Sequence, residues 1–296
     1  MEKQNKAIII LEALFAVVVW GGTFVATKFA LREASPATIV WVRFGIGVLI
    51  LGATVAIRKQ FIIPKREEWA YLALTGFIGV TFHQWLQATG LITAQATVTA
   101  WIVATIPIFS ALLGWIFLRE KLNPIRILGI VVATLGVLLV VTRGNLASIL
   151  SGHFGTFGDF LILISAVNWA VFSVLSRRGL AQHPPALMMF YVMLFGWLFA
   201  GIWLFGFGPG LSEIRTLTSA GWGSILILGI LGSGLAYIAW YDALKALPVA
   251  QLSAFIYIEP LVTMVVAAML LSEAVTLAAL AGGAITIMGI YLVNKP

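Results

Sequence analysis

The sequence predicts an all-α polytopic membrane protein whose ten transmembrane helices form two inverted five-helix repeats. Hydrophobic residues make up 61% of the chain and charged residues 10%, and the mean hydropathy is +1.06. About a quarter of the residues are charged in an ordinary soluble domain, so this composition is typical of a protein that lies in a lipid bilayer. The apolar residues gather in long stretches, and these stretches occur in two similar sets.

Charges, prolines and glycines divide the chain into ten apolar stretches. Most of them are long enough for an α-helix, with its rise of about 1.5 Å per residue, to cross about 30 Å of hydrocarbon. The first stretch follows Lys3 and Lys6, but its length and the later stretches favour a membrane helix over a cleaved signal peptide. In chain order the stretches cover 7–27, 36–57, 69–90, 96–118, 124–142, 157–176, 186–205, 220–240, 249–271 and 276–293.

The two sets of stretches are copies of one another. A shift of 149 residues aligns Trp20 with Trp169, and a shift of 153 residues continues the match to the C-terminus. The change of shift implies a four-residue insertion in the second copy, which we place in the Gly- and Pro-rich loop at 206–210. We expect the first repeat to cover 1–145 and the second 146–296. The aligned pairs include Lys28 with Arg177, Pro36 with Pro185, Gly76 with Gly229, Gly79 with Gly232, Pro107 with Pro260, Glu120 with Glu273, Gly129 with Gly282 and Gly136 with Gly289.

The distribution of Lys and Arg predicts the orientation. With the N-terminus inside the cell, the cytoplasmic segments hold thirteen of these residues and the opposite segments hold four. Such an excess is usual on the cytoplasmic side, so both termini are expected there. Five helices per copy is an odd number, so the second copy must enter the membrane from the opposite face. Inverted repeats of this kind are typical of transporters and build their sites near mid-depth.

Several functional classes are disfavoured. The chain has no cysteine, and His153 and His183 lie in loops without a second ligand at metal spacing. The short loops leave no room for a soluble catalytic domain, and no phosphate-binding loop or nucleophile elbow is present. No basic cluster with interleaved aromatic residues indicates nucleic-acid binding. We therefore expect no catalytic residue, metal, cofactor or nucleic-acid partner. A channel stays open as an alternative, because two inverted halves can also form a pore.

Polar and aromatic residues near mid-depth are the candidates for a central substrate site. His83 and Gln87 share one helix face, and a polar face of this kind is expensive in lipid unless it faces a wet cavity or another helix. Glu259 is the most deeply placed carboxylate, suited either to carry a proton or to pair with a substrate ammonium. For the aromatic residues, ordinary packing is the alternative to substrate contact. The full candidate set is Trp20, His83, Gln84, Gln87, Trp101, Trp169, Tyr237, Tyr241, Tyr257 and Glu259.

Pro107 and Pro260 are predicted hinges. Each lies about 11 residues into its stretch and removes the backbone bond to the carbonyl four residues earlier, which then needs another partner. The alternative is a packing kink without ligand contact. Arg43, Glu120 and Glu273 are expected to be structural charges. For Arg43 we favour pairing with Glu120, Glu273 or a helix end over contact with a substrate carboxylate.

These residues also resemble a known family. Trp20 and Gly21, Arg43, and Pro107 with Glu120 match the EamA branch of the drug/metabolite transporter superfamily, and the second copy repeats the template with Trp169, Glu259, Pro260 and Glu273. Within that branch the chain is most similar to the YddG-type exporters of aromatic and other amino acids. The resemblance implies a ten-helix fold, a central cavity, alternating access and export of small metabolites.

We expect an exporter of aromatic and other neutral amino acids in the inner membrane of a bacterium, with both termini cytoplasmic. Its expected partners are the small-molecule substrate and the lipid bilayer, with no obligate protein partner, so that it functions as a monomer. Export of lipophilic cations or of another metabolite is the alternative. Small multidrug exporters of the same superfamily carry a carboxylate in the middle of the first helix, whereas this chain has only Glu12 near its start. Both uniport and ion-coupled antiport therefore stay open.

Overall fold

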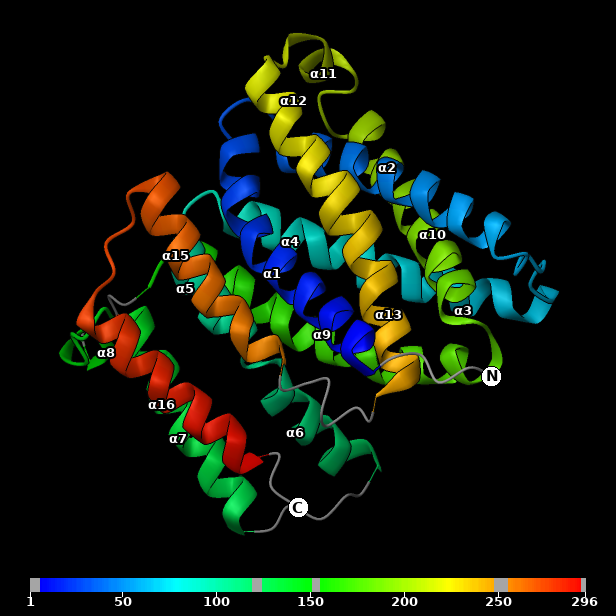
Figure 1. The fold of residues 1–296 in the computed structure, drawn as a ribbon. Helices are drawn as coiled ribbons and strands as arrows, with labels where there is room; N and C mark the ends of the chain where they lie inside the picture. Colours follow the sequence, from blue (N-terminus) through cyan, green and yellow to red (C-terminus); the bar gives the residue numbers. More distant parts are fainter. Residues whose placement is uncertain (1–5, 119–123, 151–154, 248–254, 294–296) are drawn as a thin grey trace.

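The computed structural model describes residues 6–118, 124–150, 155–247 and 255–293, and all regular structure in these ranges is helical (Figure 1). Glu120 lies outside the described residues. The elements are α1 (Lys6–Ala30), α2 (Pro36–Ile57), η1 (Arg66–Glu68), α3 (Trp69–Gly76), η2 (Phe77–Phe82), α4 (His83–Gly90), α5 (Ala96–Val103), α6 (Ile106–Leu118), α7 (Pro124–Val141), α8 (Ala147–Leu150), α9 (Phe157–Gln182), α10 (Pro185–Gly206), α11 (Ser212–Thr216), α12 (Ser219–Leu226), η3 (Ile227–Leu235), α13 (Ala236–Ala246), η4 (Ile256–Ile258), α15 (Glu259–Leu271) and α16 (Leu277–Val293).

Eight of the ten expected apolar stretches coincide with a helix or an unbroken run of helices. The fourth is divided near its middle, and the ninth, whose first part lies outside the described residues, contains the short 3₁₀ turn η4 before α15. In the described part of the chain, seven helical segments are long and apolar enough to cross a membrane, and Ile256–Leu271 and Leu277–Val293 are shorter apolar helices. Large apolar side chains such as Leu49, Met269 and Leu277 are strongly exposed on the outside of the bundle. Surfaces of this kind fit contact with lipid rather than with water.

The last helices of the two repeats, α7 and α16, cross very closely (Figure 1). A Cβ atom built on Gly129 would lie 2.6 Å from the carbonyl oxygen of Gly289, and one on Gly136 would lie 2.6 Å from that of Gly282. The residue numbers thus rise along α7 as they fall along α16, so the two helices are antiparallel. Gly129 and Gly282 are repeat partners, as are Gly136 and Gly289, so each close contact is the counterpart of the other.

The remaining helices follow the same reciprocal arrangement. The second helices of the repeats, α2 and α10, also pack antiparallel, since Trp41 meets Gly201 at one end and Gly52 meets Phe190 at the other. The first helix, α1, packs on α13 and α15 of the second repeat, and its counterpart α9 packs on α4 and α6 of the first. These contacts between the repeats therefore come in pairs related by an approximate twofold axis.

Hydrogen bonds join two connections at the end of the bundle where α1 leads into α2. The carboxylate of Glu213 accepts bonds from the backbone and hydroxyl of Ser35 and from the hydroxyl of Thr38, at 2.6–2.8 Å. Glu33 in turn accepts bonds from the backbone and hydroxyl of Thr218, at 2.8 and 2.7 Å. Each connection thus supplies the carboxylate that holds the start of a helix in the other repeat.

The close crossing of α7 and α16 leads to a stability prediction. Gly136→Ala would place a methyl group 2.5 Å from the Thr286 backbone nitrogen, and overpacking of this kind typically destabilises a core by about 1–3 kcal/mol. We expect a lower melting temperature in detergent micelles, measured by tryptophan fluorescence. Gly223→Ala is the matched control, because a Cβ there meets nothing within 4 Å and alanine favours a helix. Equal melting temperatures for the two variants would contradict the close crossing.

The hydrogen-bonded connections lead to a pH prediction. Partial burial of Glu213 acts to raise the pKa of its carboxyl, but the bonds from Thr38 and Ser35 outweigh burial and hold the pKa below the ordinary value of 4.5. The side-chain and backbone bonds from Thr218 likewise lower the pKa of Glu33. Since both pKa values are depressed in the folded chain, these bonds stabilise the fold above pH 4.5, and that stabilisation is lost as the pH falls through the folded-state pKa.

We therefore expect the melting temperature to fall on acidification below pH 4.5, and Glu213→Gln to show a smaller fall over the same range. Glu67→Gln serves as the control, because Glu67 is exposed and distant from these connections in the sequence. Parallel pH profiles for the wild type and Glu213→Gln would show that the bonds to Glu213 do not stabilise the fold.

Candidate functional site

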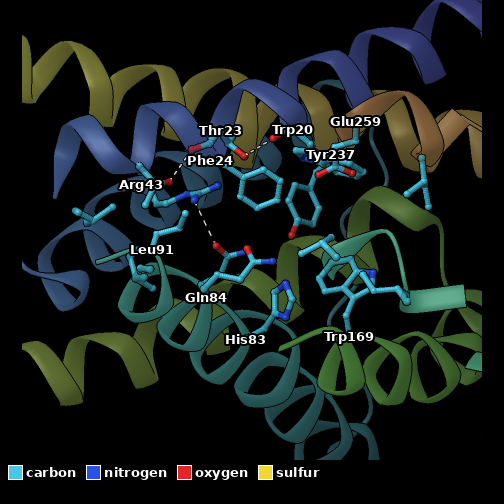
Figure 2. Close-up of a pocket in the computed structure, with 18 of the residues that line it drawn as sticks. Trp20, Thr23, Phe24, Arg43, His83, Gln84, Leu91, Trp169, Tyr237 and Glu259 are labelled. Atoms are coloured by element: carbon cyan, nitrogen blue, oxygen red, sulfur yellow. Dashed lines mark hydrogen bonds between the residues drawn. The ribbon is translucent and has the colours of Figure 1, made fainter. Parts of the chain in front are cut away.

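A cavity of about 100 Å³ lies between the two repeats (Figure 2). Helices of both copies line it: α1, α2, α4, α5 and α6 from the first, and α9, α13, η4 and α15 from the second. Its walls combine aromatic, amide, hydroxyl and charged side chains. The lining residues are Trp20, Thr23, Phe24, Thr27, Ile39, Val40, Arg43, His83, Gln84, Gln87, Ala88, Leu91, Val103, Ile106, Trp169, Tyr237, Trp240, Ile256 and Glu259.

Both predicted hinge prolines lie directly behind helix breaks that face this cavity. Pro107 is the second residue of α6, which begins after a two-residue turn at the end of α5. Pro260 is the second residue of α15, which follows a short 3₁₀ turn. Proline suits these positions because it lacks an N–H and its backbone is preset for a first helical turn. The carbonyl of Ile256, which would otherwise lose its partner to Pro260, accepts the N–H of Glu259.

Two π-helical segments, η2 and η3, directly precede α4 and α13, which line the cavity, and the sequence did not predict them. They occupy equivalent places in the two repeats and contain the aligned glycines Gly79 and Gly232. A Cβ on Gly79 would collide with the Phe172 ring, and one on Gly232 would lie 2.8 Å from the Thr23 methyl. Trp20 donates a hydrogen bond of 3.1 Å to the Gly232 carbonyl. In the sequence, only the aligned glycine pairs pointed to these two π-helical segments.

Arg43 supplies the positive charge of the cavity. Its side chain is buried, and it donates hydrogen bonds from Nε to the Ser233 hydroxyl at 3.0 Å and from Nη1 to the Gln84 carbonyl oxygen at 3.3 Å. Among the described residues no carboxylate forms an ion pair with it. The expected partner Glu273 binds elsewhere, and Glu120 is outside the described residues.

Glu259 supplies the negative charge. It begins α15, where the partial positive charge of a helix N-terminus favours a carboxylate. The residue is 7% exposed, and within the described part of the chain no donor forms a hydrogen bond with its carboxylate. Only its backbone carbonyl is engaged, by the Thr263 hydroxyl at 2.9 Å. An uncompensated carboxylate thus faces the cavity.

Aromatic groups form two opposing clusters in the walls. Trp20 makes ring contacts with Tyr237 and Trp240 at centroid distances of 5.5 and 5.3 Å. Its repeat partner Trp169 contacts the imidazole of His83 at 4.6 Å. The Nδ1 atom of His83 lies 3.2 Å from the Ser165 carbonyl. A carbonyl can only accept, so Nδ1 carries the proton in this contact.

Most of the predicted substrate-site residues meet at this cavity. Seven of the ten line it, and Arg43, predicted as a structural charge, joins them: the seven are Trp20, His83, Gln84, Gln87, Trp169, Tyr237 and Glu259. Thr23, Thr27 and Trp240 also line it and were missed. Their signal was helical spacing, because Thr23 and Thr27 share a face with Trp20, and Trp240 lies one turn after Tyr237.

Three predicted residues lie away from the cavity. Trp101 is 1% exposed and occupies the space left by Gly283, where a Cβ would collide with its ring. Tyr241 stacks on Tyr237 at 6.2 Å without reaching the lining. Tyr257 packs with a separate apolar cluster near Ile290.

Glu273 and Lys28 hold the connection between α4 and α5 at one end of the cavity. Glu273 accepts hydrogen bonds from the backbone nitrogens of Ala96 and Thr97, at 2.8 and 3.0 Å. Lys28 donates to the carbonyls of Leu91 and Ala94, at 3.2 and 2.5 Å. The carboxylate thus caps the start of α5 and the ammonium holds the end of α4.

Comparison with known proteins matches this chain over both repeats. The sequence profile of the EamA-like transporter family fits residues 7–142 and 156–295. An uncharacterized transporter of Archaeoglobus fulgidus is 29% identical over 93% of this chain and 93% of its own length. A probable terminal-alkyne amino-acid exporter of Streptantibioticus cattleyicolor is 28% identical over 99% of this chain and 95% of its own. One crystal structure shares the fold at a TM-score of 0.70 and 19% identity, covering 98% of this chain and 96% of its own.

Proposed function

The chain belongs to the EamA-like transporter family, and we propose that it exports aromatic and other neutral amino acids by alternating access around the central cavity. The observation that carries the proposal is the cavity itself: it is walled by both repeats and bordered by two broken helices. A site at a repeat interface, formed by discontinuous helices, is the usual construction of secondary transporters. The YddG-type specificity is part of this proposal and is supported by the aromatic lining and by the relative named as an amino-acid exporter.

The proposal includes an inverted topology of ten membrane crossings, with both termini in the cytoplasm of a bacterial cell. Two observations support it. Equivalent helices of the two repeats pack antiparallel, which an axis in the membrane plane would produce. The excess of Lys and Arg falls on the side that this orientation makes cytoplasmic.

In this orientation the connection held by Lys28 and Glu273 lies on the outer side. Release of the substrate requires the helices at that end to separate while those at the inner end approach. Pro107 and Pro260 are suited to absorb the change, because each interrupts a helix that faces the cavity. The two repeats rock against each other in this mechanism, and the substrate moves little.

Export of lipophilic cations is a second candidate function, favoured by one feature. Glu259 lines the same cavity as Trp20, Tyr237 and Trp240, and a carboxylate beside aromatic faces suits a cationic ligand. Arg43 in the same cavity disfavours a ligand that carries only positive charge.

Counterflow in liposomes tests the proposed function. The purified chain is reconstituted in liposomes that are loaded with unlabelled phenylalanine. Labelled phenylalanine, threonine or tetraphenylphosphonium is then added outside, and its uptake into the liposomes is measured. We expect transient accumulation of both amino acids, because a carrier loaded on each side exchanges them. Protein-free liposomes are the control. Uptake of tetraphenylphosphonium alone would instead support the cation exporter, and currents without exchange would support a channel.

Two tryptophans provide a paired test of the site. Trp169→Leu removes a ring that faces the cavity, so we expect the half-saturation concentration for phenylalanine to rise about threefold to tenfold. Trp101→Leu is the matched control, because this buried ring packs outside the cavity. It is expected to lower the melting temperature while leaving the half-saturation concentration of the folded fraction unchanged. The opposite pattern would place the substrate near Trp101.

A further inference from the structure

The cavity contains one buried guanidinium and one buried carboxyl group that do not pair with each other. In the described residues the ion pairs are Arg58 with Asp242 and His183 with Glu68, and neither includes a cavity charge. Arg43 and Glu259 come from different repeats and enter the cavity from separate elements, α2 and α15 (Figure 2). Figure 2 shows Tyr237 between them.

Neither charge is fully satisfied by the protein. Arg43 uses Nε and Nη1 to bind Ser233 and Gln84, whereas no acceptor among the described residues meets its Nη2. Gly232 leaves space beside this nitrogen, since a Cβ there would lie 3.4 Å from Nη2. The carboxylate of Glu259 accepts no hydrogen bond from the described side chains. Burying an ion without a counterion is strongly unfavourable, so a carboxylate beside Arg43 stabilises the guanidinium, and an ammonium beside Glu259 stabilises the ionised carboxylate.

The two groups also limit each other's ligands. A ligand with only a carboxylate satisfies Arg43 and leaves Glu259 without a partner, and a ligand with only an ammonium does the reverse. A molecule that carries an ammonium and a carboxylate on the same carbon atom offers a partner to each group and keeps the occupied cavity neutral. An α-amino acid at neutral pH is such a molecule.

We propose that Arg43 binds the carboxylate of an α-amino acid and that Glu259 binds its ammonium group. This inference rests on the proposed function. The aromatic rings of Trp20 and Tyr237 then contact the remainder of the substrate. Selection thus depends on the zwitterionic head more than on the side chain, which agrees with a range of neutral amino acids.

Competition in the wild-type protein tests this without any substitution. Counterflow of labelled phenylalanine is measured with three competitors: unlabelled phenylalanine, phenethylamine, which lacks the carboxylate, and 3-phenylpropionate, which lacks the ammonium. Hydrogen bonds to charged groups contribute enough to discriminate roughly tenfold to hundredfold. We expect both single-charge competitors to be weaker than phenylalanine by that factor.

Two variants assign each charge to its residue. Arg43→Gln is expected to reduce the preference for phenylalanine over phenethylamine while keeping the preference over 3-phenylpropionate. Glu259→Gln is expected to do the converse, and Arg43→Lys to retain part of the carboxylate preference. Arg66→Gln and Glu67→Gln, at exposed positions, are the matched controls and should leave both ratios unchanged.

The outcomes separate this inference from the proposed function. If phenylalanine exchanges but phenethylamine competes equally well, the two-charge recognition is overturned and the amino-acid exporter stands. If Arg43→Gln weakens all three competitors by the same factor, Arg43 has only a structural role. If no amino acid exchanges in the wild type, the proposed function fails, and the inference with it.

Discussion

The constraint on which the structure depends is that a polar group in hydrocarbon must find a partner within the protein. Unbroken helices meet this constraint along most of the chain. The repeat-related breaks before Pro107 and Pro260 occur where the chain borders the cavity, and Val103 and Ile256, whose carbonyls lose their usual donors, both line it. The π-helical segments follow the same logic, because Trp20 uses the Gly232 carbonyl in one of them as an acceptor. Backbone groups left without a helical hydrogen bond are therefore tolerated beside the cavity, and the helix breaks in turn help to form its walls.

The approximate twofold axis makes the backbone of the cavity symmetric, whereas its side chains are not. The repeat partner of Glu259 is Ile106, and both line the cavity. The partner of Arg43 is Val192, and the partner of Tyr237 is Gln84. One repeat thus provides the cation and the amides, and the other provides the anion and the phenol. A symmetric scaffold can rock between two states, and an asymmetric lining can bind a ligand whose two ends differ.

The sequence predicted the fold more closely than the site. Helix extents followed from charges and prolines, because these residues mark where a chain can leave hydrocarbon; α2, for example, covers the predicted 36–57. For the site, the sequence indicated how far along its helix each residue lies, but not which way its side chain points. Trp101 lies two residues before Val103, which lines the cavity, yet its ring packs against Gly283 on a helix from the other repeat. Which face of a helix points toward the cavity depends on the helices that pack against it. The order of residues in the sequence does not identify those neighbouring helices. The same limit applies to Arg43, whose Ser233 and Gln84 partners come from two distant helices.

Under the proposed function, the unpaired Arg43 and Glu259 also affect when the cavity can close. Closing an empty cavity strips water from Arg43 and Glu259 without providing counterions, which is unfavourable for each group as long as it is ionised. Closing it around a zwitterion replaces that water with two charge-assisted hydrogen-bonded contacts, so the closed state becomes accessible mainly when the substrate is bound. A ligand shifts a conformational equilibrium only through its different affinity for the two states, and the buried charges create that difference. Under this proposal the pair that selects the substrate also slows the return of the empty carrier, so exchange of amino acids across the membrane is expected to be faster than net export.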